Sequence, residues 1–211
     1  MSQDEVFDIY DEEMTKIGVE RREIVHAKGY WHQTFHCWIV NRTHNGGAKL
    51  LLQLRHPDKD TYPGLLDISS AGHLQSGETV EDGVRELEEE LGIRAAMDEL
   101  VYCGMVPQEK QLPMGLIDRE FNHIFIYEFG KPLEAYEYQA DEISGLFFAE
   151  LEDFKRLVSG EVDRIEIEGI VNDESEYSGS LRRREIGPDD VTPRSDEYYN
   201  LLFQKIADLT S

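Results

Sequence analysis

Apolar runs separated by turn residues recur along the chain and predict a sheet with a few helices. The predicted strands cover residues 6–10, 16–19, 33–40, 49–55, 100–106, 121–129, 143–148, 164–168 and 181–186. Spacing typical of helices occurs instead at residues 21–28, 79–91, 150–158 and 196–209. Strands interspersed with helices indicate a mixed sheet packed by helices, in an α/β or α+β layered fold.

Glycine and serine positions divide the 211 residues into three segments. We expect residues 1–28 to form an N-terminal extension of short strands and residues 29–160 to form the main domain. The character of the sequence changes after Ser159 and Gly160. Residues 161–211 are therefore expected to form an appendage that packs on the domain or lies at the interface of a homodimer.

The predicted helix 79–91 has two contrasting faces when residues are stepped by about 100° each. The apolar stripe comprises Val80, Val84, Leu87 and Leu91, and the acidic face comprises Asp82, Glu86, Glu89 and Glu90. Glu86 meets Glu89 and Glu90 three and four residues further on, and these like charges repel. Binding of Mg²⁺, which prefers oxygen ligands, makes such a face favourable. A merely solvated face is the alternative in so acidic a chain.

Net charge limits the partners that we expect for the protein, and cysteine content indicates its compartment. The chain has 21 Lys and Arg against 44 Asp and Glu, a formal charge of −23, which repels nucleic acid and anionic lipid. We expect neither a nucleic-acid nor a membrane partner, although a phosphorylated substrate can bind through a cation. Two cysteines, Cys37 and Cys103, suit a reducing compartment. With neither a signal peptide nor an apolar run of membrane length, a cytoplasmic location is expected.

Residues 72–93 resemble the Nudix box, whose pattern is Gly, five residues, Glu, seven residues, Arg-Glu-apolar-x-Glu-Glu-x-Gly-apolar. The matching positions are Gly72, Glu78, Arg85, Glu86, Leu87, Glu89, Glu90, Gly92 and Ile93. The departure is one missing residue, because six rather than seven separate Glu78 from Arg85. This shortening changes the register of Glu78 but not the spacing of Glu86 to Glu90.

The resemblance implies an α/β/α sandwich with a mixed sheet and a loop-helix-loop catalytic motif. It also implies hydrolysis of a diphosphate linked to another moiety, with Mg²⁺ or Mn²⁺ as the cofactor and a small-molecule diphosphate as the partner. Metal ligands would be Glu86, Glu90 and Glu89. Residues with a catalytic role would come from Glu89, Glu86 and Glu120. Arg85, Glu78 and Gly92 would be structural within the motif, and Arg55, Gly72 and His73 would contact the substrate.

Over residues 29–154 the chain looks most like the branch of type I isopentenyl-diphosphate isomerases and their hydrolase-like relatives. His32, His73, Asp118 and Glu120 match metal or acid positions of the isomerases. Ala71 stands where the isomerases carry a cysteine, which disfavours isomerase activity. A pyrophosphohydrolase is therefore the favoured function, with an isomerase or a non-catalytic metabolite sensor as alternatives. No role is expected for His26.

Overall fold

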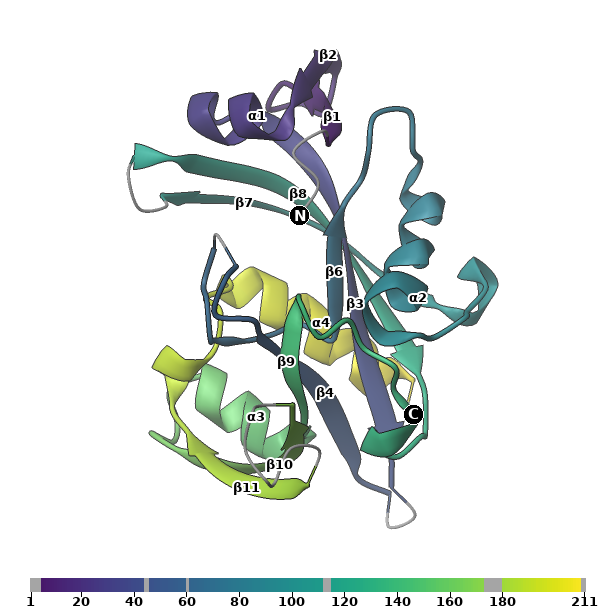
Figure 1. Cartoon of the computed structure of the whole chain (residues 1–211), viewed down its shortest axis with the longest axis vertical. Coiled ribbons are helices and arrows are strands. Elements are labelled where there is room, and N and C mark those ends of the chain that lie inside the picture. The colour runs from purple at the N-terminus through teal and green to yellow at the C-terminus, as the bar shows by residue number, and fades with distance from the viewer. Residues whose placement is uncertain (1–4, 44–45, 60, 112–114, 173–179, 210–211) are drawn as a thin grey trace.

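Two long strands, β3 (Trp31–Arg42) and β8 (Ile117–Glu128), lie side by side in parallel along most of the molecule (Figure 1). The computed structural model describes residues 5–43, 46–59, 61–111, 115–172 and 180–209. Both strands are rich in β-branched and aromatic residues, which favour a pleated, buried backbone. They form the centre of the sheet and carry much of the candidate site.

The remaining strands pair antiparallel with their neighbours, so the sheet is mixed. They are β1 (Val6–Tyr10), β2 (Lys16–Arg21), β4 (Ala48–Arg55), β5 (Leu66–Asp67), β6 (Ser70–His73), β7 (Val101–Gln111), β9 (Ile143–Glu150), β10 (Ile165–Val171) and β11 (Leu181–Ile186). Their order is β11-β10-β9-β4-β3-β1-β2; β5 pairs with β4, β6 and β8 pair with β3, and β7 pairs with β8.

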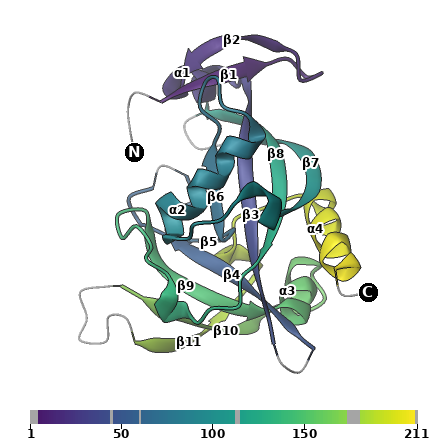
Figure 2. The same cartoon turned by 90° about the vertical axis from the view of Figure 1, so that its right-hand side faces the viewer.

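Helices cover both faces of this sheet, and Figure 2 shows α2 (Arg85–Leu91) and α4 (Asp196–Asp208) on opposite sides of β3. Leu87 of α2 belongs to the same apolar cluster as Phe35. Leu202 of α4 and Phe154 of α3 (Leu151–Val158) share a second cluster with Trp38. Since alternate residues of a strand face opposite sides, Phe35 points toward α2 and Trp38 points toward α3 and α4. The predicted layered fold is confirmed.

The short helix α1 (Arg22–Lys28) lies near one end of β3 and β8 in Figure 1, and its apolar residue Val25 packs with Phe7 and Ile9 of β1. None of the helices in the described part of the chain is long and apolar enough to cross a membrane.

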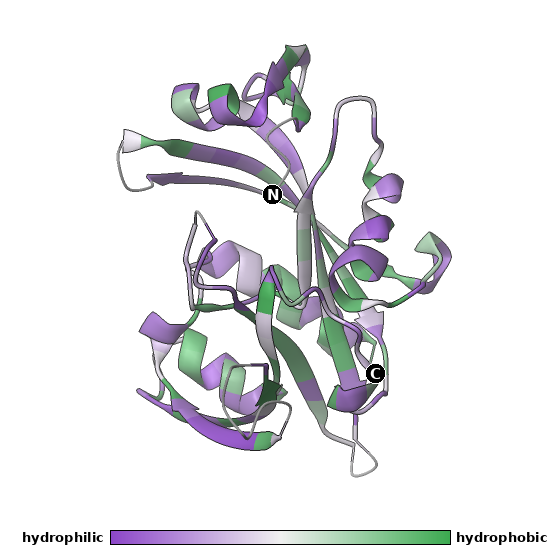
Figure 3. Ribbon diagram, viewed as in Figure 1, coloured by the Kyte–Doolittle hydropathy of each residue, from purple (hydrophilic) through white to green (hydrophobic). Residues whose placement is uncertain are grey.

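Polar side chains are buried at the α1 end of the sheet. Figure 3 shows many hydrophilic positions on β7 and β8 near α1, whereas β4 beside β9 is largely apolar. The buried polar residues of β3, β6 and β8 are His32, Thr34, His36, Ser70, Asp118, Glu120, Asn122 and His123. Buried polar groups are costly unless they are paired, so this end of the sheet is where a ligand site is expected.

The structure corrects two local predictions. No strand was predicted over residues 66–73, but Leu66–Asp67 pair with β4 as β5, and Ser70–His73 pair with Thr34 to Cys37 of β3 as β6. Small residues such as these have weak strand propensity, so a distant partner decides their conformation. The predicted α-helix over 79–91 is wrong in its first part: Val80–Val84 form a 3₁₀ helix, and the α-helix begins at Arg85.

The segment after Gly160 continues the sheet and the core. β10 pairs with β9, and α4 places Tyr198 in the large apolar cluster. The hydroxyl of Tyr198 accepts a hydrogen bond from Trp38 Nε1 at 3.0 Å and hydrogen-bonds His36 Nδ1 at 3.1 Å. α4 is thus joined to β3 by polar as well as apolar contacts, while the division of the chain into three segments stays a prediction.

We predict that Tyr198→Phe lowers the free energy of unfolding by about 1–3 kcal/mol, because it leaves two buried polar groups of β3 without a partner. Urea denaturation followed by fluorescence measures the change. Tyr199→Phe is the control, because the Tyr199 hydroxyl forms no hydrogen bond with the residues that the structure describes, and it should change stability by less than about 0.5 kcal/mol. Equal losses in the two variants would contradict the assigned network.

Candidate active site

Arg85, the first residue of α2, holds three acidic side chains and a strand in one arrangement. Its Nε and Nη2 donate to the two carboxylate oxygens of Glu78 at 2.8 and 3.0 Å, and Nη2 also donates to the carbonyl oxygen of His73 at 3.0 Å. Its Nη1 donates to Glu86 at 2.6 Å and Glu89 at 2.9 Å. A bidentate guanidinium–carboxylate pair is strong and directional, so Arg85 fixes how the loop, α2 and β6 meet.

The 3₁₀ helix explains how Glu78 reaches Arg85 although one residue is missing between them. Five residues of 3₁₀ helix, Val80–Val84, follow the cap residue Thr79. They rotate the chain by about 600° and advance it by about 10 Å, whereas six residues of α-helix give about 600° and about 9 Å. The 3₁₀ helix therefore compensates for the missing residue, because the chain reaches Arg85 after nearly the same rotation and the same length.

Glu86 and Glu90 are buried against β6, with 8% and 5% of their surface exposed. Glu90 Oε2 accepts a hydrogen bond from the backbone N–H of Ala71 at 2.9 Å. Gly72 leaves room for Glu86, since a Cβ atom on Gly72 would lie 2.0 Å from the Glu86 carboxyl carbon. Gly72 is thus needed here for space.

Burial raises the pKa of the Glu90 carboxyl above its ordinary value, and the neighbouring Glu86 raises it further. Burial likewise raises the pKa of Glu86, although Arg85 opposes the shift. Two neighbouring buried carboxyls therefore favour either bound protons or a bound cation.

Glu89 and Gly92 lie at the outer side and at the end of the same helix. The Glu89 side chain is 52% exposed while it pairs with Arg85. Gly92 ends α2 in the left-handed region with φ 67°, and its N–H donates to the Glu88 carbonyl oxygen. The helix therefore presents Glu86 and Glu90 inward and leaves Glu89 accessible to solvent.

A second cluster of metal-ligating side chains comes from β3, β8, β6 and α1. His32 of β3 faces Asp118 and Glu120 of β8, and the ligand atoms of these three residues lie within 4.8 Å of one another. His26 of α1 and His73 of β6 form a similar group with His32. Burial lowers the pKa of all three histidines, so the rings are neutral, as metal ligation requires.

Within this cluster, His32, Asp118 and Glu120 are the residues best suited to bind a divalent cation. His32 Nδ1 lies 3.1 Å from the Tyr30 carbonyl oxygen and donates to it, which leaves the lone pair on Nε2. Nε2 and Asp118 Oδ1, 3.7 Å apart, are both buried without a hydrogen-bond partner among the described residues. Buried atoms are rarely left unpaired, so the observed pair fits a divalent cation.

His73 and His26 are held differently. Arg22 Nη1 lies 3.2 Å from His73 Nδ1 and donates to it, which places the ring proton on Nε2, 3.9 Å from Glu120. His26 was missed by sequence reasoning. It lies on α1, and only the folding of that helix against β1 and β3 brings it to the cluster, so no spacing in the sequence signals it.

Arg55, predicted to contact the substrate, donates within the protein from each of its three side-chain nitrogens. Nε and Nη2 bond to Thr61, and Nη1 bonds to Asp67 at 2.9 Å. Asp67 also accepts from Thr192 at 2.6 Å and from Arg194 at 3.0 Å. Arg55 therefore joins Thr61 to Asp67, and its substrate role stays a prediction. Arg194 was not expected in this network.

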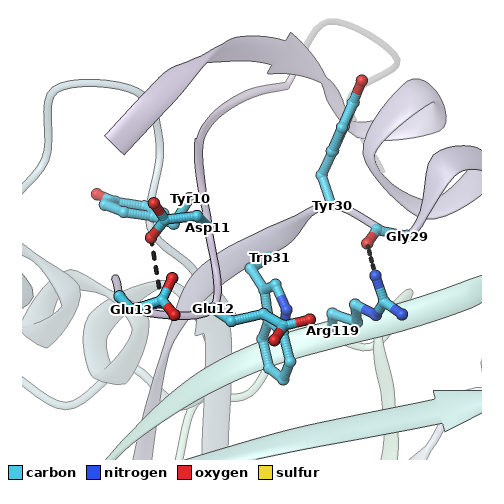
Figure 4. Close-up of a pocket in the computed structure, with 8 residues that line it drawn as sticks. All are labelled: Tyr10, Asp11, Glu12, Glu13, Gly29, Tyr30, Trp31 and Arg119. Carbon is cyan, nitrogen blue, oxygen red and sulfur yellow. Dashed lines mark hydrogen bonds between the residues drawn. The ribbon is translucent and has the colours of Figure 1, made fainter. Parts of the chain in front are cut away.

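A separate pocket of about 340 Å³ lies on the other face of β3 and β8 (Figure 4). Its lining residues are Tyr10, Asp11, Glu12, Glu13, Gly29, Tyr30, Trp31 and Arg119. Trp31 comes directly before His32, and Arg119 lies between Asp118 and Glu120. Because successive residues of a strand face opposite sides, both point away from the histidine–carboxylate cluster. The Arg119 guanidinium lies 6.0 Å from the centre of the Trp31 ring and donates to Gly29. This pocket is thus distinct from both ligand clusters.

Comparisons with known proteins identify the family. Residues 31–166 match the model of the NUDIX domain. An uncharacterized Nudix hydrolase of Clostridium acetobutylicum is 44% identical over 208 residues, 98% of each chain. An isopentenyl-diphosphate Delta-isomerase of Serratia proteamaculans is 32% identical over 149 residues, 68% of this chain and 79% of that protein.

The fold agrees with these sequence relationships. A crystal structure of a Deinococcus radiodurans protein superposes with a TM-score of 0.53 at 24% identity, covering 74% of this chain and 90% of that one. Because the family model spans α2 and its surroundings and the clostridial relative aligns over nearly every residue, the chain belongs to the Nudix hydrolase superfamily.

Proposed function

We propose that the protein hydrolyses the diphosphate bond of an organic diphosphate with the help of Mg²⁺ or Mn²⁺. The observation that carries this proposal is the pair of buried carboxyls, Glu86 and Glu90, pressed against the backbone of β6. Their burial is unfavourable for the charged forms, and a divalent cation held by both carboxylates would offset this cost.

Glu86 and Glu90 would hold the cation, and Glu89 would complete its ligands or accept a proton from the attacking water. A divalent cation bound there supplies Lewis acidity toward the phosphoryl oxygens. Arg85 keeps the Glu86 carboxylate oriented through its 2.6 Å hydrogen bond, and it holds Glu89 within reach of solvent. Arg85, Glu78 and Gly92 therefore act as positioning residues.

His32, Asp118 and Glu120 would hold a second cation. Their mixed nitrogen and oxygen ligands suit Mn²⁺ or Zn²⁺ better than Mg²⁺, which takes oxygen ligands. β6 lies between the two sets, because Ala71 bonds to Glu90 while His73, two residues later, faces Glu120. The two sets are therefore separated by the backbone of β6.

We predict that Glu90→Gln lowers kcat by at least about a hundredfold without unfolding the protein, because the amide keeps the shape but loses the charge that holds the cation. Phosphate release over a panel of organic diphosphates, with saturating Mg²⁺ and Mn²⁺, measures the loss. Glu88→Gln is the matched control, because Glu88 lies on the same helix, is exposed and pairs with Arg94. A near-normal rate in Glu90→Gln would rule out this role.

We also predict that Mg²⁺ raises the melting temperature more at about pH 8.5 than at about pH 6, because protons compete with the cation for Glu86 and Glu90. The sign follows from their raised pKa values: each carboxyl holds its proton to a higher pH in the folded state than in the unfolded one. Without a cation, this contribution to stability falls as the pH rises through the folded pKa.

Differential scanning fluorimetry at matched ionic strength measures these shifts, and the Glu86→Gln/Glu90→Gln double variant is the control. It should lose most of the Mg²⁺ effect at both pH values. Equal shifts in wild type and double variant would show only screening of the net charge of −23.

The histidine–carboxylate cluster and the 32% identity to an isomerase favour isopentenyl-diphosphate isomerisation as a second candidate. That reaction adds one proton and removes another, and the relevant β6 position carries Ala71, whose side chain cannot ionise. Cys37, fully buried, belongs to the apolar cluster on the α2 side of the sheet. Hydrolysis places no such demand on residue 71, so it is the better-supported activity.

We expect no isomerase product when the protein is incubated with isopentenyl diphosphate, Mg²⁺ and Mn²⁺ in deuterated buffer. Loss of an acid–base group typically costs about two to four orders of magnitude in rate. Deuterium incorporation and dimethylallyl diphosphate are measured by NMR. Efficient formation of either would favour the isomerase over the hydrolase.

A further inference from the structure

Two buried cations flank Glu120 Oε2, whereas Glu120 Oε1 faces His73. Lys110 of β7 and Arg194, which precedes α4, have side chains only 10% and 6% exposed. Their nearest nitrogen atoms lie 3.9 and 4.0 Å from Glu120 Oε2. These distances allow electrostatic attraction but are too long for hydrogen bonds.

Most N–H groups of these cations have no partner in the described part of the chain. Arg194 Nη2 donates to Asp67, but Arg194 Nε is buried and unpaired. A guanidinium carries five N–H donors and an ammonium three. Since unmade hydrogen bonds of buried charged groups are costly, the buried Arg194 Nε–H favours an acceptor that is not supplied by the described residues.

The carboxylates beside Lys110 and Arg194 are each shared between two cations. Asp67 pairs with both Arg55 and Arg194, so one carboxylate faces two guanidinium groups. Glu120 is the shared counter-ion of Lys110 and Arg194. If Glu120 held a divalent cation together with His32 and Asp118, its charge would no longer be available to Lys110 and Arg194, and these two cations would need another anionic partner.

The Tyr62 ring lies beside Lys110. Tyr62 lies in the 56–64 loop with φ 49°, a conformation that is rare for a bulky residue. The Lys110 ammonium lies 5.6 Å from the centre of its ring. Loop residues held in strained conformations often belong to binding sites, and here the strained residue covers Lys110.

We propose that Lys110 and Arg194 bind a phosphate group of the substrate that is separate from the diphosphate held at Glu86 and Glu90. This inference rests on the proposed hydrolase function and specifies its substrate class: organic diphosphates that carry an additional phosphate. Two buried cations with unused donors match the several oxygen acceptors of a phosphate, and they are a poor surface for a hydrocarbon chain. The C-terminal segment thereby contributes a residue to the site.

The test is calorimetric titration of inorganic phosphate into the full-length protein loaded with Mn²⁺. Arg194→Met also removes a buried partner of Asp67, so Lys110→Met, which leaves Asp67 untouched, is the informative variant. We expect Lys110→Met to weaken phosphate binding by at least about tenfold, the size of a charged hydrogen bond. Lys110→Arg keeps the charge and should stay within about threefold of wild type.

Two controls separate this site from other effects. Lys49→Met removes a lysine on β4 that pairs with Glu150 outside the site, and it should leave phosphate binding unchanged. Glu86→Gln/Glu90→Gln should retain phosphate binding while it loses hydrolysis. Unchanged binding in Lys110→Met, loss of binding in the double variant alone, or absence of millimolar binding by wild type would each overturn the proposal.

Hydrolysis of the matched pair NADPH and NADH, which differ by one phosphate, tests the substrate class. Wild type should prefer NADPH, and Lys110→Met should reduce the ratio of the two kcat/KM values by at least about tenfold. Retained preference in Lys110→Met would overturn the proposal. If no diphosphate is hydrolysed but phosphate binding still depends on Lys110, the hydrolase function fails and the phosphate site stands.

Discussion

The guanidinium of Arg85 is the contact on which the charged part of the structure depends. It bonds together the loop at Glu78, the helix at Glu86 and Glu89, and β6 at the His73 carbonyl oxygen. Without this cation, the carboxylates would repel one another and turn toward solvent. One planar group with fixed donors makes all of these bonds. The rotation of α2 about its own axis is therefore fixed relative to β6, and Glu86 and Glu90 face inward.

β6 links this helix to the second ligand cluster. One face of the short strand leaves space at Gly72 for Glu86, while its other face carries His73 beside His32 and Glu120. The two candidate cation sites are thus built on opposite sides of four residues. Such a strand, held mainly by its pairing with β3, brings ligands from the helix layer and from the sheet close to each other.

Sequence alone predicted most of the strands, the apolar positions Leu87 and Leu91 of α2 and its acidic face, because these follow from local periodicity. It missed β6, whose conformation depends on pairing with β3, and it missed His26, whose position depends on how α1 packs. Arg194 was missed for a similar reason: more than a hundred residues separate it from Asp67. Such contacts are set by tertiary structure, which no local spacing reveals.

The 3₁₀ helix before Arg85 has a consequence for how homologous sequences are aligned. A gap in an alignment is usually taken as a shift of everything beyond it, yet here the change of helix type absorbs the gap within two turns. The total rotation and advance of the chain, rather than the residue count, are then the quantities that are preserved. Relatives with motifs of different lengths can present superimposable side chains, and searches that require a fixed spacing will overlook some of them.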